Sequence, residues 1–182
     1  EIMFGLNLVV YKGKTIFVGD TSVHEYPTSE QMAEMAISAA RVVRLFGFDP
    51  KVAFVSHSTF GQPLTSRTKH IKNAVEILKN KKVNFEFDGD MQPDVALNKE
   101  YQNLYPFSKI VGNANILIMP GQHSAAISYK MMKELGDTKV IGPLLIGLGL
   151  PIEIAPLRSS TSEILNLASI AAYSADVIDY KK

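Results

Sequence analysis

The segment Lys51-Val-Ala-Phe-Val-Ser-His-Ser-Thr-Phe-Gly61 places a short apolar run directly before small polar residues, an imidazole and a glycine. An apolar run of this length is typical of a buried parallel strand. A loop of hydroxyl-bearing residues that opens toward a helix is one way in which α/β proteins build anion pockets. The segment therefore predicts an α/β fold, and we expect a functional site at this loop.

Strand-like and helix-like segments alternate along the rest of the chain. Leu6–Tyr11 and Thr15–Val18 flank a Lys-Gly-Lys turn and are predicted to form a hairpin. The further predicted strands are Val52–Val55, Phe85–Phe87, Ile116–Met119, Val140–Leu148 with a break at Gly142-Pro143, and Ile152–Ala155. The first predicted helix begins after Thr28 and ends at Gly47. The further predicted helices are Ser66–Lys79, a helix and turn within Tyr101–Phe107, Ser124–Leu135 and Thr161–Ile178. This alternation predicts a layered α/β fold, a mainly parallel sheet with crossover helices on its faces.

Two helix starts carry a capping box, in which a hydroxyl residue is followed three positions later by Gln or Glu. Thr28 and Gln31 precede the first long helix, which Gly47 ends. Ser160 and Glu163 precede the closing helix in the same arrangement. Both pairs predict where a helix begins.

Composition excludes several classes of function. The 19 basic and 18 acidic residues give no strong field of either sign, so we expect neither nucleic acid nor a membrane as partner. The chain has no cysteine, and its four histidines lack metal-ligand spacing, so we predict no metal site. The apolar stretch Val140–Ile154 is broken by glycines, prolines and Glu153, which argues against a membrane span. We expect a cytoplasmic protein, and we interpret the start at Glu1 as a cut within a longer polypeptide.

Five segments at predicted strand ends together resemble the phosphate acetyltransferase/butyryltransferase family. They follow that family's order and spacing and cover nearly the whole chain, so residues 1–182 are expected to form one domain. The segments are Asp20–Gln31, Phe46–Ser58, Asp88–Ala96, Ala114–Pro120 and Ile141–Gly147. Within the family, Asp88-Gly-Asp-Met-Gln92 and Gln122-His-Ser-Ala-Ala-Ile-Ser128 resemble the C-terminal domain of the large bacterial NADP-dependent malic enzymes.

The resemblance implies a fold shared with the isocitrate and isopropylmalate dehydrogenases. It also implies an N-terminal malic enzyme part, outside this chain, which would hold NADP and a divalent metal and oxidatively decarboxylate malate to pyruvate. The domain in hand would then be a regulatory module that binds acetyl-CoA and contributes to a homo-oligomer. No cofactor is expected within the fragment itself.

The chain departs from the active transferases at the residues that would perform acetyl transfer. In such enzymes a Ser-Arg pair after the last strand binds phosphate and supports the reacting group, and the aligned positions here are Pro156 and Leu157. A cysteine found in many transferases is Thr21 here. Arg158 stands one residue from the missing arginine, so binding is expected to survive where turnover does not. Glu163 matches a carboxylate suited to a base role, which makes it a candidate vestigial base, although its capping box explains it without catalysis.

The candidate ligand-binding residues lie at the ends of predicted strands. Ser56, His57, Ser58 and Thr59 would donate hydrogen bonds to a phosphate, and Arg67 would add charge. The alternative is a turn whose hydroxyl groups satisfy only their own backbone.

Further candidates follow the next predicted strands. Gln92 lies between Asp88 and Asp94 at a strand end, where ligands of α/β sheets bind, and Asp94 is alternatively a helix cap. Gln122, His123 and Ser124 would line the same cleft, or Ser124 would cap its helix. Two larger groups of residues are interpreted without a ligand. The solvated face of a helix explains the lysines Lys69, Lys72, Lys79, Lys81 and Lys82. The core or a dimer interface explains the apolar stripe of Ile164, Leu165, Ala168, Ala171 and Ala172.

Three hypotheses for function follow from these residues. The first is a regulatory acetyl-CoA-binding and oligomerisation domain without turnover. The second is an active phosphate acetyltransferase, which converts acetyl-CoA and phosphate to acetyl phosphate and CoA. The third is a structural scaffold with an unused pocket.

Overall fold

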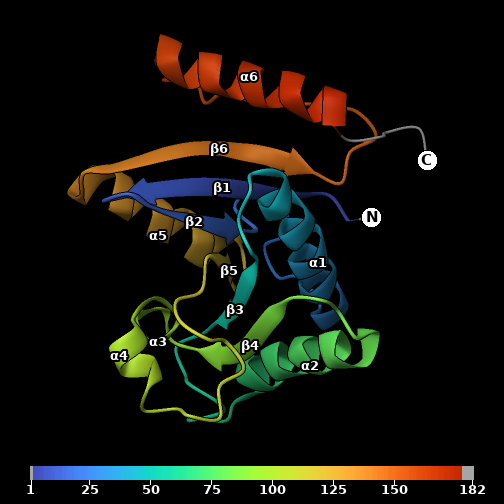
Figure 1. Cartoon of the computed structure of the whole chain (residues 1–182), viewed down its shortest axis with the longest axis vertical. Helices are drawn as coiled ribbons and strands as arrows, with labels where there is room; N and C mark the ends of the chain where they lie inside the picture. The colour runs from blue at the N-terminus through green and yellow to red at the C-terminus, as the bar shows by residue number, and fades with distance from the viewer. Residues whose placement is uncertain (1, 178–182) are drawn as a thin grey trace.

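The structure, a computed structural model, describes residues 2–177 and contains one six-stranded sheet (Figure 1). The strands are β1 (Phe4–Tyr11), β2 (Lys14–Gly19), β3 (Lys51–Val55), β4 (Glu86–Met91), β5 (Ile116–Ile118) and β6 (Thr138–Ile146). Their order across the sheet is β4-β3-β5-β2-β1-β6. β2, β5, β3 and β4 are parallel, whereas β1 is antiparallel to both of its neighbours, β2 and β6. The α/β prediction is therefore confirmed, with a mixed sheet in which β1 alone is reversed.

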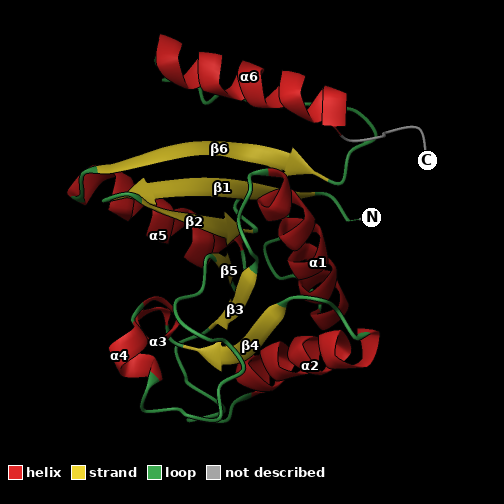
Figure 2. Ribbon diagram, viewed as in Figure 1, coloured by secondary structure: helices red, strands yellow, loops and turns green. Residues whose placement is uncertain are grey.

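Helices cover both faces of the sheet, as the predicted layering requires (Figure 2). The helices are α1 (Ser29–Leu45), α2 (Ser66–Lys81), α3 (Pro93–Leu97), α4 (Lys99–Gln102), α5 (Gln122–Leu135) and α6 (Thr161–Val177). Figure 1 shows α6 beyond β6 at one end of the molecule and α2, α3 and α4 at the other. Buried residues of α1 and α2 pack on one face of the sheet, and those of α3 and α5 pack on the other.

Alternation of apolar residues along the strands produces these two cores. Phe54 of β3 joins the core under α1 and α2, whereas its neighbours Ala53 and Val55 join the core under α3 and α5. Phe17 and Val18 of β2 divide in the same way. Successive strand residues point to opposite faces, so a strand covered on both sides is apolar throughout. This is why the run before Ser56 has no polar residue.

The predicted hairpin turn at Gly13 and the predicted capping box at Thr28 are confirmed. Lys12 and Gly13, with φ of 47° and 75°, form the two-residue turn between β1 and β2. This left-handed pair matches the twist of a hairpin. Thr28 and Gln31 form the reciprocal capping box of α1. Each of these local motifs needs only neighbouring residues, so the sequence was sufficient.

The predicted strand from Val140 is confirmed as β6, but its predicted break and the predicted strand Ile152–Ala155 are wrong. β6 runs unbroken through Gly142-Pro143, because β6 lies at the edge of the sheet and the pairing with β1 shifts register opposite those two residues. Edge strands and bulges tolerate proline, which cannot donate to the ladder. Ile152–Ala155 is not a strand and forms only one bridge, between Leu144 and Glu153.

Helix boundaries also differ from the prediction in two places. α5 begins at Gln122 with Gly121 as its N-cap, and the Ser124 hydroxyl donates to the Gly121 carbonyl inside the first turn instead of capping the helix. The short helix predicted within Tyr101–Phe107 is α4, which begins earlier because the Asn98 side chain caps it. α6 confirms the closing helix, and its predicted last residue, Ile178, lies outside the described residues.

A matched pair of substitutions tests the core. Leu78 of α2 is fully buried, whereas Leu157 is fully exposed. Leu78→Ala is expected to lower the free energy of unfolding by about 2 to 5 kcal/mol, because it removes buried methyl groups and leaves a cavity. Leu157→Ala is expected to change it by less than about 0.5 kcal/mol. Denaturant unfolding of both variants would contradict the packing if the two losses were equal.

A second prediction concerns pH. Burial raises the pKa of Glu153 to about 7, against a hydrogen bond from the Leu145 N–H that favours the charged form. Because the folded state holds this proton more tightly than the unfolded chain, the free energy of unfolding is expected to fall as pH rises from 4.5 through about 7. Melting wild type and Glu153→Gln between pH 5 and pH 8 should show a smaller decline in the variant. Glu134→Gln, at an exposed position, is the control and should keep the wild-type decline; an identical decline in all three would contradict the prediction.

Candidate functional site

Loops at the carboxyl ends of the parallel strands form the edge where a site is expected. From β3 the chain proceeds to β4 on one side, and from the adjacent β5 it proceeds toward β6 at the opposite edge. Such a reversal marks the crevice in which α/β sheets bind ligands. Ser56 follows β3 and Gly121 follows β5, so both border this crevice.

The hydroxyl groups of the loop after β3 have partners within the protein. Ser56 Oγ accepts from the Ser58 N–H at 3.3 Å, and Thr59 Oγ1 accepts from the Gln92 N–H at 3.2 Å. The Ser58 hydroxyl, fully buried, donates to Asp90 Oδ2. The structure therefore gives these three side chains the backbone-ordering role that was the alternative to phosphate binding.

Asp90 ties this loop to the end of β4. Its Oδ1 accepts from the Gly61 N–H at 2.9 Å, and its carbonyl accepts from the Phe60 N–H at 2.6 Å. Phe60 and Gly61 have φ of 50° and 81° and form a tight turn, since Thr59 and Gln62 exchange backbone hydrogen bonds. Sequence reasoning missed Asp90, although its position at a strand end in Asp88-Gly-Asp was the available signal.

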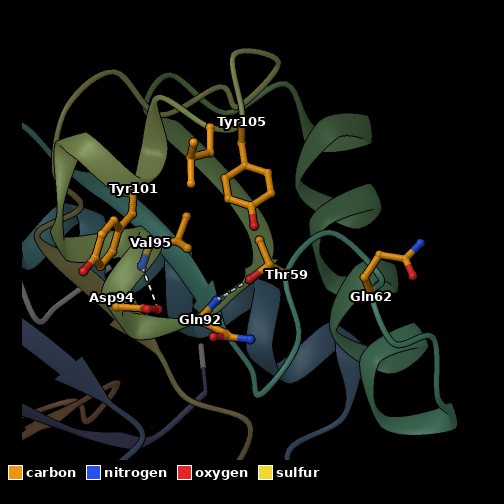
Figure 3. A pocket seen from close by; sticks show the side chains of 8 residues that line it. Thr59, Gln62, Gln92, Asp94, Val95, Tyr101 and Tyr105 are labelled. Atoms are coloured by element: carbon orange, nitrogen blue, oxygen red, sulfur yellow. Dashed lines mark hydrogen bonds between the residues drawn. The ribbon is translucent and has the colours of Figure 1, made fainter.

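A pocket of about 350 Å³ opens beside this turn (Figure 3). Residues from the loop after β3, from α3, and from α4 and the segment after it line the pocket. They are Thr59, Gln62, Gln92, Asp94, Val95, Tyr101, Leu104 and Tyr105. In Figure 3 the Tyr105 hydroxyl points toward Thr59 across the pocket. Polar groups near the loop and aromatic rings from the α4 side suit a ligand that is part polar and part apolar.

Gln92, one of the predicted site residues, lines this pocket, whereas Asp88 does not. Gln92 is the N-cap residue of α3 without a side-chain capping bond, and its Nε2 donates to the His57 carbonyl at 3.0 Å. Asp94 also lines the pocket, and it lies within α3 instead of capping it. Asp88 accepts from the Lys109 N–H at 2.7 Å, a structural role.

His57 and Arg67, in and after the loop that follows β3, are both exposed. His57 is the exposed member of a loop whose neighbours Ser56 and Ser58 are buried. Arg67 lies in the first turn of α2, with its guanidinium 5.3 Å from the centre of the Tyr26 ring. A stacked guanidinium keeps its charge and its N–H donors for an anion.

The structure does not bring Arg158 and Glu163 to this loop. Glu163 Oε1 lies 2.9 Å from Lys133 Nζ, which fixes the start of α6 beside the last turn of α5 and therefore near the beginning of β6. Ser56 instead follows the end of β3, and the strands β5, β2 and β1 lie between β3 and β6 in the sheet. Arg158 is exposed in the turn that precedes α6.

Glu163 has the environment of a structural carboxylate. The Lys133 ammonium, followed by the Ser160 N–H and hydroxyl, lowers the pKa of Glu163 to about 2. The capping box with Ser160 is present, with the Glu163 N–H donating to Ser160 Oγ and both Ser160 donors directed to the carboxylate. A general base works best with a pKa near the operating pH. The geometry therefore favours the capping role over the base role.

The third group of candidates follows β5. Gln122 N–H donates to the His24 carbonyl at 3.1 Å, and His123 Nε2 lies 3.1 Å from Glu25 Oε1 at the surface. These contacts join the start of α5 to the loop after β2. Among the pocket-lining residues, none comes from this group.

Asp20, at the end of β2, is a second buried carboxylate on the same edge. It accepts from the backbone N–H groups of Gly5, Ser22, Val23 and His24, and from His24 Nδ1 at 2.8 Å. Thr21, the next residue, is buried and donates to Asn7 Oδ1 at 2.8 Å.

The remaining groups singled out in the sequence lie on the surface. Lys79 and Lys81 pair with Glu76 and Glu34, in keeping with a solvated face of α2. On α6, Ile164 and Leu165 are exposed, so this stripe is not core within the described chain. Over residues 2–177, no group of three or more His, Cys, Asp or Glu side chains is arranged to hold a metal ion. In that same range, no helix is long and apolar enough to cross a membrane.

Comparison with known proteins adds family information to this geometry. A family model described as phosphate acetyl/butaryl transferase matches residues 1–172. An NADP-dependent malic enzyme of Rhizobium meliloti is 46% identical over 173 residues, which are 95% of this chain and 23% of that protein. A phosphate acetyltransferase of Clostridium acetobutylicum is 35% identical over 162 residues, 88% of this chain and 49% of that protein.

Solved structures agree with this match. A phosphotransacetylase from Streptococcus pyogenes superposes with a TM-score of 0.91 at 30% identity, over 97% of this chain and 54% of its own. A 4-hydroxythreonine-4-phosphate dehydrogenase from Klebsiella pneumoniae, at 13% identity and a TM-score of 0.56, is similar in fold alone. The chain thus spans 23% of the malic enzyme's length and 54% of the transacetylase's.

The role of Glu163 can be tested by substitution. Glu163→Gln removes the charge that binds Lys133 and weakens the capping box, so the free energy of unfolding is expected to fall by about 1 kcal/mol or less. Ser160→Ala should cost a similar amount, because it removes the other half of the box. Thermal melts at pH 7 check both values. A Glu163→Gln variant as stable as wild type, with Ser160→Ala destabilised, would contradict the structural role.

Proposed function

Because the chain belongs to the phosphate acetyl/butaryl transferase family, we propose that it binds acetyl-CoA as a regulatory ligand without transferring the acetyl group to phosphate. The observation that carries the proposal is the pocket beside the loop after β3, which joins polar groups such as Gln92 to aromatic rings such as Tyr105. At about 350 Å³ it is at the lower end of ligand pockets, so it would hold part of a coenzyme.

The site would use the residues that remain available at this edge. Arg67 would meet a phosphate of the coenzyme with charge-assisted hydrogen bonds, and His57 and Gln92 would donate to neutral oxygen atoms. Ser56, Ser58 and Thr59 would act by holding the loop in shape. Arg158, near the start of α6, would have no part in this pocket.

The chemistry that acetyl transfer needs supports the proposed absence of turnover. A phosphate oxygen must attack the thioester carbonyl, the C–S bond must break, and the thiolate must receive a proton. Pro156 and Leu157 offer neither a hydroxyl nor a guanidinium for these steps. Glu163 is bound to Lys133 and Ser160 at the other edge of the sheet, away from the pocket.

Similarity to malic enzymes supports a place for this domain in a longer protein. In that protein an N-terminal malic enzyme part would use NADP and a divalent metal to convert malate to pyruvate in the cytoplasm, and acetyl-CoA would bias the two states of an oligomer. The exposed apolar residues Ile164 and Leu165 of α6 support a contact with another domain or a second copy. A relation of the fold to the isocitrate and isopropylmalate dehydrogenases is part of the same proposal.

An active phosphate acetyltransferase is the second candidate, and the similarity to the Clostridium enzyme favours it. Calorimetric titration with acetyl-CoA, CoA and acetyl phosphate, followed by an acetyl-transfer assay in the same sample, separates the candidates. Binding of acetyl-CoA without acetyl phosphate formation is expected. Turnover would establish the transferase, and a complete lack of binding would leave the structural scaffold.

Two arginine variants test the location of the ligand. Arg67→Ala is expected to weaken acetyl-CoA binding about tenfold or more, because a charge-assisted hydrogen bond contributes roughly 1.5 to 3 kcal/mol. Arg158→Ala, the matched control, should bind like wild type. The reverse pattern in calorimetry would move the site to the α6 side, and unchanged binding in both would reject the proposed pocket.

A further inference from the structure

We propose that Asp90 is a specificity-determining residue, whose buried carboxylate takes up the donors of the loop after β3 and thereby excludes inorganic phosphate from it. The inference rests on the proposed function, because it assigns to that site a preference for a neutral thioester over a free phosphate. Inorganic phosphate is the molecule that would accept the acetyl group in acetyl transfer.

The first argument is the use of donors. Ser58 hydroxyl and Gly61 N–H both donate to the Asp90 carboxylate, and Phe60 N–H donates to the Asp90 carbonyl. In many α/β proteins such loop hydroxyl and N–H groups bind the oxygens of a phosphate. Here the Asp90 carboxylate already accepts hydrogen bonds from two of these donors. A phosphate entering the loop would have to displace it.

The second argument is burial. Ser58 is 0% exposed and Asp90 is 1% exposed, so water does not replace the bonds between them. Removing either partner of a buried polar pair leaves the other without its hydrogen bond, which is costly. A phosphate that displaced the Asp90 carboxylate from the Ser58 hydroxyl would leave that carboxylate buried without its hydrogen bond, which is unfavourable apart from any effect of charge.

The third argument is charge. The Asp90 carboxylate accepts a hydrogen bond from Gly61 of the Phe60-Gly61 turn, and Asp94 lines the pocket beside the same turn. Phosphate carries negative charge, and like charges a few ångströms apart repel strongly where water is scarce. The thioester and amide groups of acetyl-CoA are neutral and meet no such repulsion. Bound acetyl-CoA would therefore lack the phosphate that must attack its carbonyl carbon, and its C–S bond would stay intact.

The test compares binding of inorganic phosphate to wild type and to two neutral variants, Asp90→Asn and Asp90→Ser. The second variant needs less space and provides a folded alternative if the first is unstable. Asp90→Glu keeps the charge, and Asp137→Asn removes one charge at an exposed position between α5 and β6. Phosphate titration is followed by ³¹P NMR, and folding of each variant is checked by thermal melting.

Phosphate affinity is expected to rise at least about tenfold in the neutral variants and to stay at the wild-type level in Asp90→Glu and Asp137→Asn. Folded neutral variants with wild-type phosphate affinity would overturn the inference, as would submillimolar phosphate binding by wild type itself. Acetyl-CoA titration of the same proteins keeps the two proposals apart. A gain in phosphate affinity without acetyl-CoA binding would leave the role of Asp90 standing and reject the coenzyme site.

Discussion

The hydrogen bonds between Asp90 and the loop after β3 are the interaction on which the candidate site depends. They hold Ser58, Phe60 and Gly61 in one arrangement, and the pocket takes its shape beside that turn. Asp20 does the same for the loop after β2 by accepting from successive N–H groups. The edge of the sheet is thus organised by carboxylates of the protein itself. This arrangement orders the loops and also sets the charge that a ligand meets.

Local patterns in the sequence were sufficient for most of the fold. Capping at Thr28 and Ser160, the turn at Gly13 and the apolar run before Ser56 depend on neighbouring residues or on burial at both faces, and all four are present in the structure. Errors arose where a distant partner decides the structure. The bulge opposite β1 carries β6 through Gly142-Pro143, and sequence periodicity does not contain that partner.

The predicted site residues stay a prediction, and the structure adds where a pocket lies relative to them. Thr59 of the loop after β3 and Gln92, which were chosen because the carboxyl ends of parallel strands meet at one edge, both line that pocket. Which side chain uses which donor depends on the pairing of β3 with β4, which brings Asp90 to Ser58 across 32 positions of the chain. The same limit applies to Tyr101 and Tyr105, whose approach to Thr59 follows from the path of the chain after α3.

Hydrogen–deuterium exchange of the chain with and without acetyl-CoA is the most direct test of the central claim, because it locates binding without any substitution. The account predicts slower exchange in residues 56–62 and 92–105, which surround the pocket, and no change in residues 156–163 before and at the start of α6. Protection confined to residues 156–163 would contradict it.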